Sequence, residues 1–250
     1  MFPEYIILVI IPIFLGFWAQ SRVSNAYAKW SKVASRGGLT GAEVADAVMR
    51  SAGIDDVRVV DLQKGQCPSD RAIGTGVTSV EIVPISGHLT DHYDPVNKRL
   101  SLSSENFYGT SLAALGVAAH ESGHAIQDRV GYRAMNLRMS LVPATNFACS
   151  LLPFIMFGGF FFHLFGLIYL AVGVYLVLTV FQLVTLPVEF DASHRAIQRL
   201  DGLGILSADE LVGAKDMLNA AGWTYVAAFV AALGNLLYFL LMISGNRNRN

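Results

Sequence analysis

Long runs without charged residues constrain this chain more than any other feature of its sequence. The longest extends from Leu141 to Val188, and shorter runs cover Ile6 to Ala19 and Trp223 to Ile243. A helix needs roughly 20 apolar residues to cross a bilayer, so the longest run can hold two spans joined by a turn, which we place near residues 158–166. Only 15% of the residues are charged, against about a quarter in soluble domains. The sequence therefore predicts a membrane protein with four transmembrane helices.

The first apolar run admits a second interpretation, a cleaved signal peptide. Residues 1–5 lack a basic segment, and no small-residue cleavage site clearly ends the run. We therefore interpret the run as a retained membrane anchor. Basic residues close to the span ends are concentrated in residues 20–140 and 189–221, and such residues favour the cytoplasmic side of a membrane. Both polar segments are therefore predicted to face the cytoplasm.

The first polar segment has the local signals of a mixed α and β structure. Thr40-Gly-Ala-Glu43 matches the capping box that begins a helix, and a further helix is expected over Ser111 to Arg129. Three short runs are typical of strands: Val57–Val60, Val77–Ile85 and Arg99–Ser103. The last two could offer a free edge to an extended peptide, which would suit a protease.

The second of these helices carries the residues that indicate chemistry. Beginning at Val117, the sequence reads V-A-A-H-E-S-G-H-A-I. His120 and His124 are four residues apart, so on a helix they share one face and can bind a single zinc ion. Glu121 can reach a water on that ion, as in H-E-x-x-H metallopeptidases. The alternative is a core helix with two hydrogen-bonded histidines, but burying two histidines and a glutamate on an apolar face without such a purpose is costly.

A catalytic zinc usually takes a third protein ligand and leaves the fourth position to water. The position six residues after His124 is Val130, so the third ligand is distant in sequence. Glu189 is the best candidate, because two spans before it return the chain to the side that carries the two histidines. The sequence predicts that a helix begins at Glu189 and runs through Leu200. The alternative role for Glu189 is an acid that stabilises the start of that helix.

Other polar residues are candidates for supporting roles at such a site. Some could line the cleft or stabilise a tetrahedral oxyanion, and Asp191 could orient a liganding imidazole. Plain surface positions, or a solvated helix face for Asp191, are the alternatives. The oxyanion candidates are His88, His92, Tyr93, His194 and Arg195.

Several sequence blocks resemble the YugP-like family of bacterial membrane zinc metallopeptidases, and the similarity spans nearly the whole chain. The blocks are Gly87–Pro95, Ser111–Gln127, Thr185–Ser193 and Thr224–Ala228. In its distant glutamate the chain is also similar to the wider HtpX and CAAX-prenyl-protease types of membrane peptidase.

The resemblance implies His120, His124 and Glu189 as zinc ligands and Glu121 as the general base. Two departures from the pattern accompany it. The wider relatives usually carry an acid where this chain has Ser193, and the loop from Lys64 to Gly76 is longer than the family pattern.

These features predict a mainly α membrane protein, in which four transmembrane helices carry a cytoplasmic, zincin-like α+β catalytic domain. Along the chain we expect an anchor in residues 1–20, the α+β domain in 21–140, two spans in 141–188, a cytoplasmic helical segment with the third ligand in 189–221, and the last span with a tail in 222–250.

The predicted function is that of a zinc metalloendopeptidase, gluzincin-like in its ligands, in the bacterial inner membrane with its site facing the cytoplasm. Its expected partners are the lipid bilayer and protein or peptide substrates, namely membrane or misfolded proteins, and no nucleic acid is expected. One alternative is a catalytically silent, metal-stabilised membrane scaffold or adaptor. Another is a site-2-type intramembrane protease, which would use an L-D-G segment in an apolar context. Here Leu200-Asp-Gly202 is flanked by charged residues. The cleavage specificity and the oligomeric state do not follow from the sequence.

Overall fold

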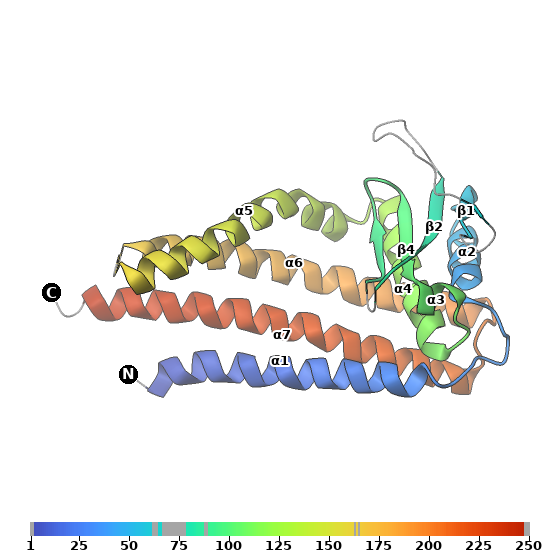
Figure 1. Ribbon diagram of the computed structural model, residues 1–250, viewed down its shortest axis with the longest axis horizontal. Coiled ribbons are helices and arrows are strands. Elements are labelled where there is room, and N and C mark those ends of the chain that lie inside the picture. Colours follow the sequence, from blue (N-terminus) through green and yellow to red (C-terminus); the bar gives the residue numbers. More distant parts are fainter. Residues whose placement is uncertain are drawn as a thin grey trace. The chain divides into compact units, whose positions relative to one another are not determined.

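The computed structural model describes residues 3–61, 65–66, 79–87, 90–162, 164 and 166–247. These residues divide into two compact units. The first unit comprises Met1–Arg22, Arg133–Pro187 and Gly222–Asn250, and the second comprises Val23–Tyr132 and Val188–Ala221. Three long helices, α1 (Pro3–Trp30), α6 (Leu167–Gly202) and α7 (Ala208–Arg247), have residues in both units, and Figure 1 labels them.

Long apolar helices form the first unit. In the described part of the chain, 4 helices are long and apolar enough to cross a membrane. They are α1 (Pro3–Trp30), α5 (Arg133–Phe161), α6 (Leu167–Gly202) and α7 (Ala208–Arg247). The predicted number of helices that could span a membrane is confirmed, and so is the presence of two helices in the longest uncharged run.

Helix α6 corrects one local prediction. The sequence predicts a helix that begins at Glu189, but α6 is continuous from Leu167 to Gly202 and includes Pro187. A proline is tolerated in a membrane helix when neighbouring groups satisfy the freed backbone positions. Glu189 therefore lies inside a helix, and its alternative role as an acid at a helix N-terminus is wrong.

Small residues and aromatic rings hold the first unit together. A Cβ atom added to Gly234 of α7 would lie 2.7 Å from the Leu8 carbonyl oxygen of α1, so only glycine permits this approach. Trp18 and Trp223 pack edge to face with ring centroids 5.3 Å apart. A separate buried cluster joins α5 and α6: Ala148, Ile155, Ala171 and Val174. Close packing of small side chains is the usual basis of helix association in lipid.

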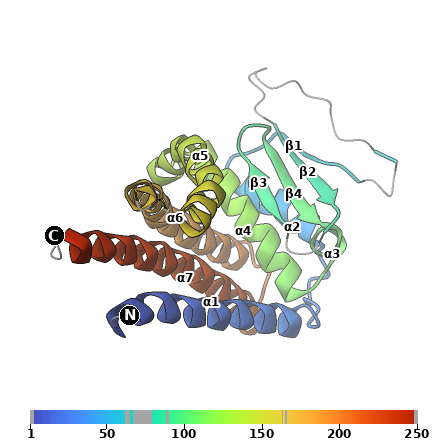
Figure 2. The same cartoon turned by 60° about the vertical axis from the view of Figure 1, so that its left-hand side comes forward.

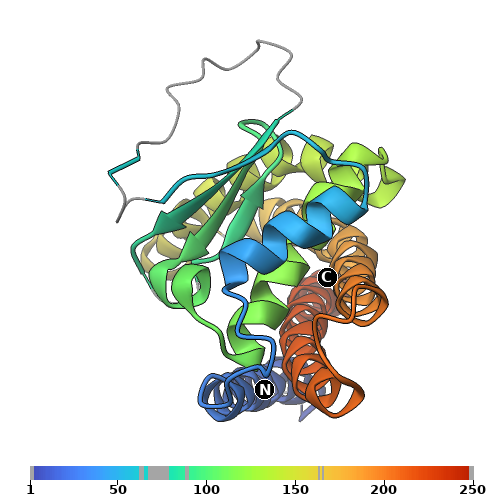
Figure 3. The same ribbon diagram turned by 90° about the vertical axis from the view of Figure 1, so that its right-hand side faces the viewer.

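The second unit contains a four-stranded sheet with the order β1-β2-β4-β3. Its strands are β1 (Val57–Val59), β2 (Val80–Ile85), β3 (His92–Asp94) and β4 (Arg99–Ser103). The first three strands in this order are parallel, and β3 pairs with β4 in the antiparallel direction. Helices α2 (Gly41–Ser51) and α4 (Leu112–Arg129) pack together on one face of the sheet (Figures 2 and 3).

The sheet order corrects the prediction about its edges. Strands β2 and β4 were the candidates to receive a peptide, but both are inner strands, and the edges of the described sheet are β1 and β3. Strand β3 consists of the three polar or aromatic residues His92–Asp94, which lack the aliphatic run that predicted β1, so the sequence did not predict it. Residues 77 and 78 of the second predicted strand, and most of the loop from Lys64 to Gly76, lie outside the described residues.

Local capping signals begin the helices where the sequence predicts them. The Thr40 side chain accepts a hydrogen bond from the Glu43 backbone, and Glu43 returns one to Thr40, which completes a capping box for α2. Ser111 caps α4 by accepting from the backbone nitrogen of Ala114. The short helix α3 (Ser104–Tyr108) between β4 and α4 was not predicted.

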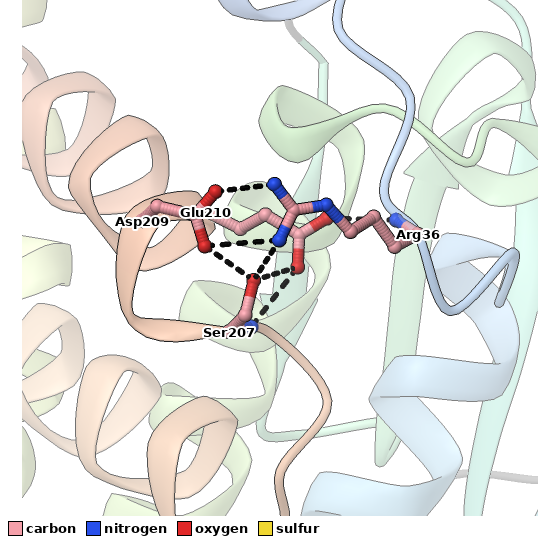
Figure 4. A network of polar contacts seen from close by, with 4 residues as sticks. All are labelled: Arg36, Ser207, Asp209 and Glu210. Atoms are coloured by element: carbon pink, nitrogen blue, oxygen red, sulfur yellow. Dashed lines mark hydrogen bonds and ion pairs between the residues drawn. The ribbon is translucent and has the colours of Figure 1, made fainter.

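A polar network fixes the segment after α1 to the start of α7 within the second unit (Figure 4). The Glu210 carboxylate accepts hydrogen bonds from the backbone nitrogens of Arg36, at 2.7 Å, and Ser207, at 3.0 Å. Arg36 also pairs with Asp209, but both of these side chains are largely exposed. Because exposed ion pairs contribute little, Glu210 should carry most of the network's contribution to stability.

We expect the substitution Glu210→Gln to lower stability by about 1 kcal/mol, as the loss of a helix cap does. Glutamine has an NH₂ group in place of one carboxylate oxygen, and the backbone nitrogens of Arg36 and Ser207 both need an oxygen to accept their hydrogen bonds. At least one of these two N–H groups therefore loses its acceptor. Asp209→Asn, at the exposed neighbouring position, is the matched control and should have the smaller effect. Thermal unfolding of the detergent-solubilised protein measures both. Equal midpoints for the two variants would contradict the assignment.

Candidate metal centre

Helices α4 and α6 bring together three side chains that could hold a metal ion. His120, His124 and Glu189 each offer one ligand atom, and these atoms all lie within 4.8 Å of one another. The Nε2 atoms of His120 and His124 lie 3.3 Å and 3.5 Å from Oε2 of Glu189. All three residues belong to the second unit. Side chains far apart in sequence therefore converge on one point.

The donor set fits zinc. Two imidazole nitrogens and one carboxylate oxygen are ligands that zinc takes in catalytic sites, where the fourth position holds water. Glu189 is 3% exposed and His124 is 8% exposed. A carboxylate and two imidazoles would not gather in such a buried place without a compensating charge or hydrogen bond. The cluster could therefore bind zinc through these three residues.

The electrostatic surroundings of His124 favour its charged form when only protein groups surround it. Burial acts to lower the pKa of His124, but the contact with Glu189 and the negative charges of Glu121 and Glu189 outweigh burial and raise that pKa. A metal must replace the proton on the imidazole before it can bind. The same negative charges that attract a proton would attract a zinc ion.

The other ring nitrogen of each histidine has its own partner. His120 Nδ1 lies 3.1 Å from the Ser193 hydroxyl oxygen, and His124 Nδ1 lies 3.0 Å from Gln127 Oε1. These contacts orient both rings so that Nε2 faces Glu189. Ser193 thus stands beside one of the two imidazoles of the candidate metal centre.

A glycine allows the two helices to come this close. A Cβ atom added to Gly123, between the two histidines on α4, would lie 2.6 Å from the Ala192 carbonyl oxygen of α6. Real side chains do not tolerate such a contact with backbone, so any larger residue would push the helices apart. The residue between the histidines therefore governs whether Glu189 can reach them.

Comparisons with known proteins agree with this geometry. Residues 5–70 and 72–244 match a family described as "Putative neutral zinc metallopeptidase". The chain is also 37% identical, over 246 residues, to the "Putative membrane protease YugP" of Bacillus subtilis (strain 168). The matched region covers 98% of this chain and 99% of the Bacillus protein. The chain belongs to this zinc metallopeptidase family.

Membership of the zinc metallopeptidase family confirms the resemblance seen in the sequence, and with it the prediction of zinc as the cofactor. No solved structure matches the chain.

In this family member, Glu121 lies on α4 directly after His120 and is 8% exposed. Its charge acts on His124. Asp191 accepts hydrogen bonds from Gln127 at 2.8 Å and from Arg195 at 2.6 Å. Asp191 is thus connected to His124 through Gln127.

Two of the five oxyanion candidates, Tyr93 and Arg195, donate hydrogen bonds to aspartates. The Tyr93 hydroxyl donates to Asp128 at 2.7 Å, and burial together with this bond raises the pKa of Tyr93. Arg195 donates to Asp191 and lies over the ring of Tyr132. His92 and His194 are exposed, and His88 lies outside the described residues.

Sequence reasoning missed the contribution of Gln127. It is fully buried and bridges α4 and α6 by hydrogen bonds. One signal was present in the sequence: Gln127 is three residues after His124, so it lies on the same helix face as that histidine.

Proposed function

We propose that the chain is a membrane-anchored zinc metalloendopeptidase that hydrolyses peptide bonds of membrane or misfolded proteins. The observation that carries the proposal is the convergence of His120, His124 and Glu189 on one point, with Glu121 beside the first histidine. Family membership supports a peptidase of this metal class.

In the proposed mechanism His120, His124 and Glu189 would hold the ion. When bound, zinc would supply Lewis-acid chemistry that makes water more acidic and polarises the scissile carbonyl. Glu121 accepts the proton of the attacking water and then delivers it to the leaving amine nitrogen. Burial of Glu121 keeps bulk water from competing for that proton.

The proposed substrates and location follow from the position in the sequence of the candidate metal ligands, which lie next to candidate spans. Glu189 follows directly on the apolar part of α6, and α4 is separated from α5 by only a few residues. A site linked so closely to membrane helices suits substrates that lie in or beside the bilayer. From the distribution of basic residues we propose that residues 21–140 and 189–221 face the cytoplasm of a bacterial cell.

A site-2-type intramembrane mechanism receives less support. It requires the H-E-x-x-H helix inside the bilayer, but α4 is not one of the candidate spans found in the described residues. Leu200-Asp-Gly202, the segment that would have to partner it, lies at the C-terminal end of α6. The membrane-anchored endopeptidase is therefore the function that we propose.

Removal of the metal tests the proposal. We expect 1,10-phenanthroline to abolish cleavage of casein by the detergent-purified protein, and stoichiometric Zn²⁺, but not Mg²⁺, to restore it. The reason is that nitrogen ligands of this kind favour zinc over magnesium. A His120→Ala preparation treated in parallel controls for contaminating proteases. Cleavage that persists in chelator, or that the His120→Ala preparation shares, would contradict the proposal.

A further inference from the structure

We propose that Gln127 is a positioning residue of the candidate zinc site, which holds His124 in the tautomer and orientation that metal binding needs. This inference rests on the proposed function, because it concerns the same site. It assigns a role to a residue that the H-E-x-x-H motif does not include.

The orientation of the Gln127 amide is decided by its surroundings. Its Nε2 lies 2.7 Å from the backbone oxygen of Val188 and 2.8 Å from Oδ2 of Asp191. The Val188 carbonyl oxygen and the Asp191 carboxylate oxygen accept these hydrogen bonds, and the backbone carbonyl can only accept. The amide NH₂ group must therefore point at both of them, which leaves the amide oxygen facing His124.

The orientation of the amide decides the tautomer of His124. Gln127 Oε1 lies 3.0 Å from His124 Nδ1, and an amide oxygen can only accept. His124 therefore carries its proton on Nδ1 in the neutral form. Its Nε2, which faces Glu189 at 3.5 Å, then offers the lone pair that a metal requires.

Gln127 also connects the two helices that supply the ligands. It belongs to α4, whereas Val188 and Asp191 belong to α6 and lie on either side of Glu189 in sequence. The Gln127 side chain is fully buried. Asp191 is held in turn by Arg195, whose guanidinium lies over the ring of Tyr132. One amide thus fixes the position of His124 relative to the helix that carries Glu189.

The first test removes the hydrogen bonds while keeping the volume. We expect Gln127→Leu to weaken zinc binding about 10–100-fold, the usual loss when a partner of a liganding histidine is removed. The measurement is the zinc dissociation constant by competition with a chromophoric chelator. Gln198→Leu, at an exposed position of α6 in the same unit, is the matched control and should bind zinc like the wild type.

The second test reverses the polarity of the hydrogen bonds and separates positioning from simple packing. Gln127→Glu keeps an acceptor for His124 but loses both donors, so its carboxylate faces the carboxylate of Asp191. We expect this variant to lose at least about 10-fold in zinc affinity. Adding Asp191→Asn supplies a donor again, and the double variant should recover at least half of the loss on a logarithmic scale. A purely structural role would show no such rescue.

The outcomes separate this inference from the proposed function. Unchanged zinc affinity in Gln127→Leu, or a double variant no better than Gln127→Glu, would overturn the role of Gln127 while the wild type still bound zinc. If Gln127→Leu fails to fold, the rescue by Asp191→Asn decides alone. Wild-type protein that binds no zinc would overturn the proposed function itself.

Discussion

The substitution Glu189→Ala is expected to reduce zinc affinity by roughly 10²–10⁴-fold. Zinc held by protein side chains gains on the order of 10–16 kcal/mol, and one of three ligands accounts for about a third of that gain. Glu189 is the anionic member of the set and its Oε2 faces the Nε2 atoms of both histidines. Its loss leaves two neutral imidazoles, which hold zinc weakly. Metal content after gel filtration, and a chelator competition, measure the effect.

Two further variants make the Glu189 result specific. Glu189→Gln keeps the volume of this buried side chain, so a loss of zinc in this variant cannot be attributed to a cavity. Asp201→Ala, an exposed acid on the same helix, should leave zinc affinity unchanged. Full zinc content in Glu189→Ala would show that the third ligand lies elsewhere.

The substitution Glu121→Gln is expected to leave zinc affinity within a few-fold of wild type and to lower kcat by about 10²–10⁴-fold, the usual contribution of a general base. Glutamine has nearly the same shape as glutamate but cannot take a proton from water. Because Glu121 is not among the three residues that offer ligand atoms at one point, the metal should remain. Cleavage of casein, normalised to bound zinc, measures the loss.

Separation of metal binding from turnover in Glu121→Gln distinguishes an enzyme from a scaffold. Glu105→Gln, at an exposed position of α3, is the control and should cleave at the wild-type rate. A zinc-loaded Glu121→Gln variant that cleaves as well as wild type would rule out Glu121 as the base. If cells that depend on this protein grow equally well with the wild type and with the zinc-loaded Glu121→Gln variant, the result would favour the catalytically silent scaffold.

Features that depend on residues close together in sequence could be predicted well. Hydropathy over a window of about 20 residues indicates a span whatever lies beside it, and the four helices appeared where the uncharged runs lie. The capping box joins Thr40 and Glu43, which are three residues apart, so it too could be predicted from neighbouring residues alone. The spacing of His120 and His124 on one helix face is likewise local. Counting spans added one long-range expectation, the proximity of Glu189 to these histidines, which the structure agrees with.

Features that depend on which distant segments meet could not be predicted in this way. The order β1-β2-β4-β3 places β2 and β4, two of the three predicted strands, inside the sheet, and no periodicity along either strand encodes its neighbours. The continuity of α6 through Pro187 depends on what surrounds that proline.

The hydrogen bonds that orient the site belong to the same class. Ser193 meets His120, and Gln127 meets Val188 and Asp191, only because Gly123 lets α4 approach α6 closely. Backbone propensity and hydropathy are properties of a short segment, so the amino-acid order contains them directly. The energy of a buried hydrogen bond depends on the distance and direction between two groups, and those are defined only when the helices have packed. For this protein, local chemistry decided which segments are helical and where the candidate metal ligands stand along the chain, and tertiary packing decided how those side chains are held.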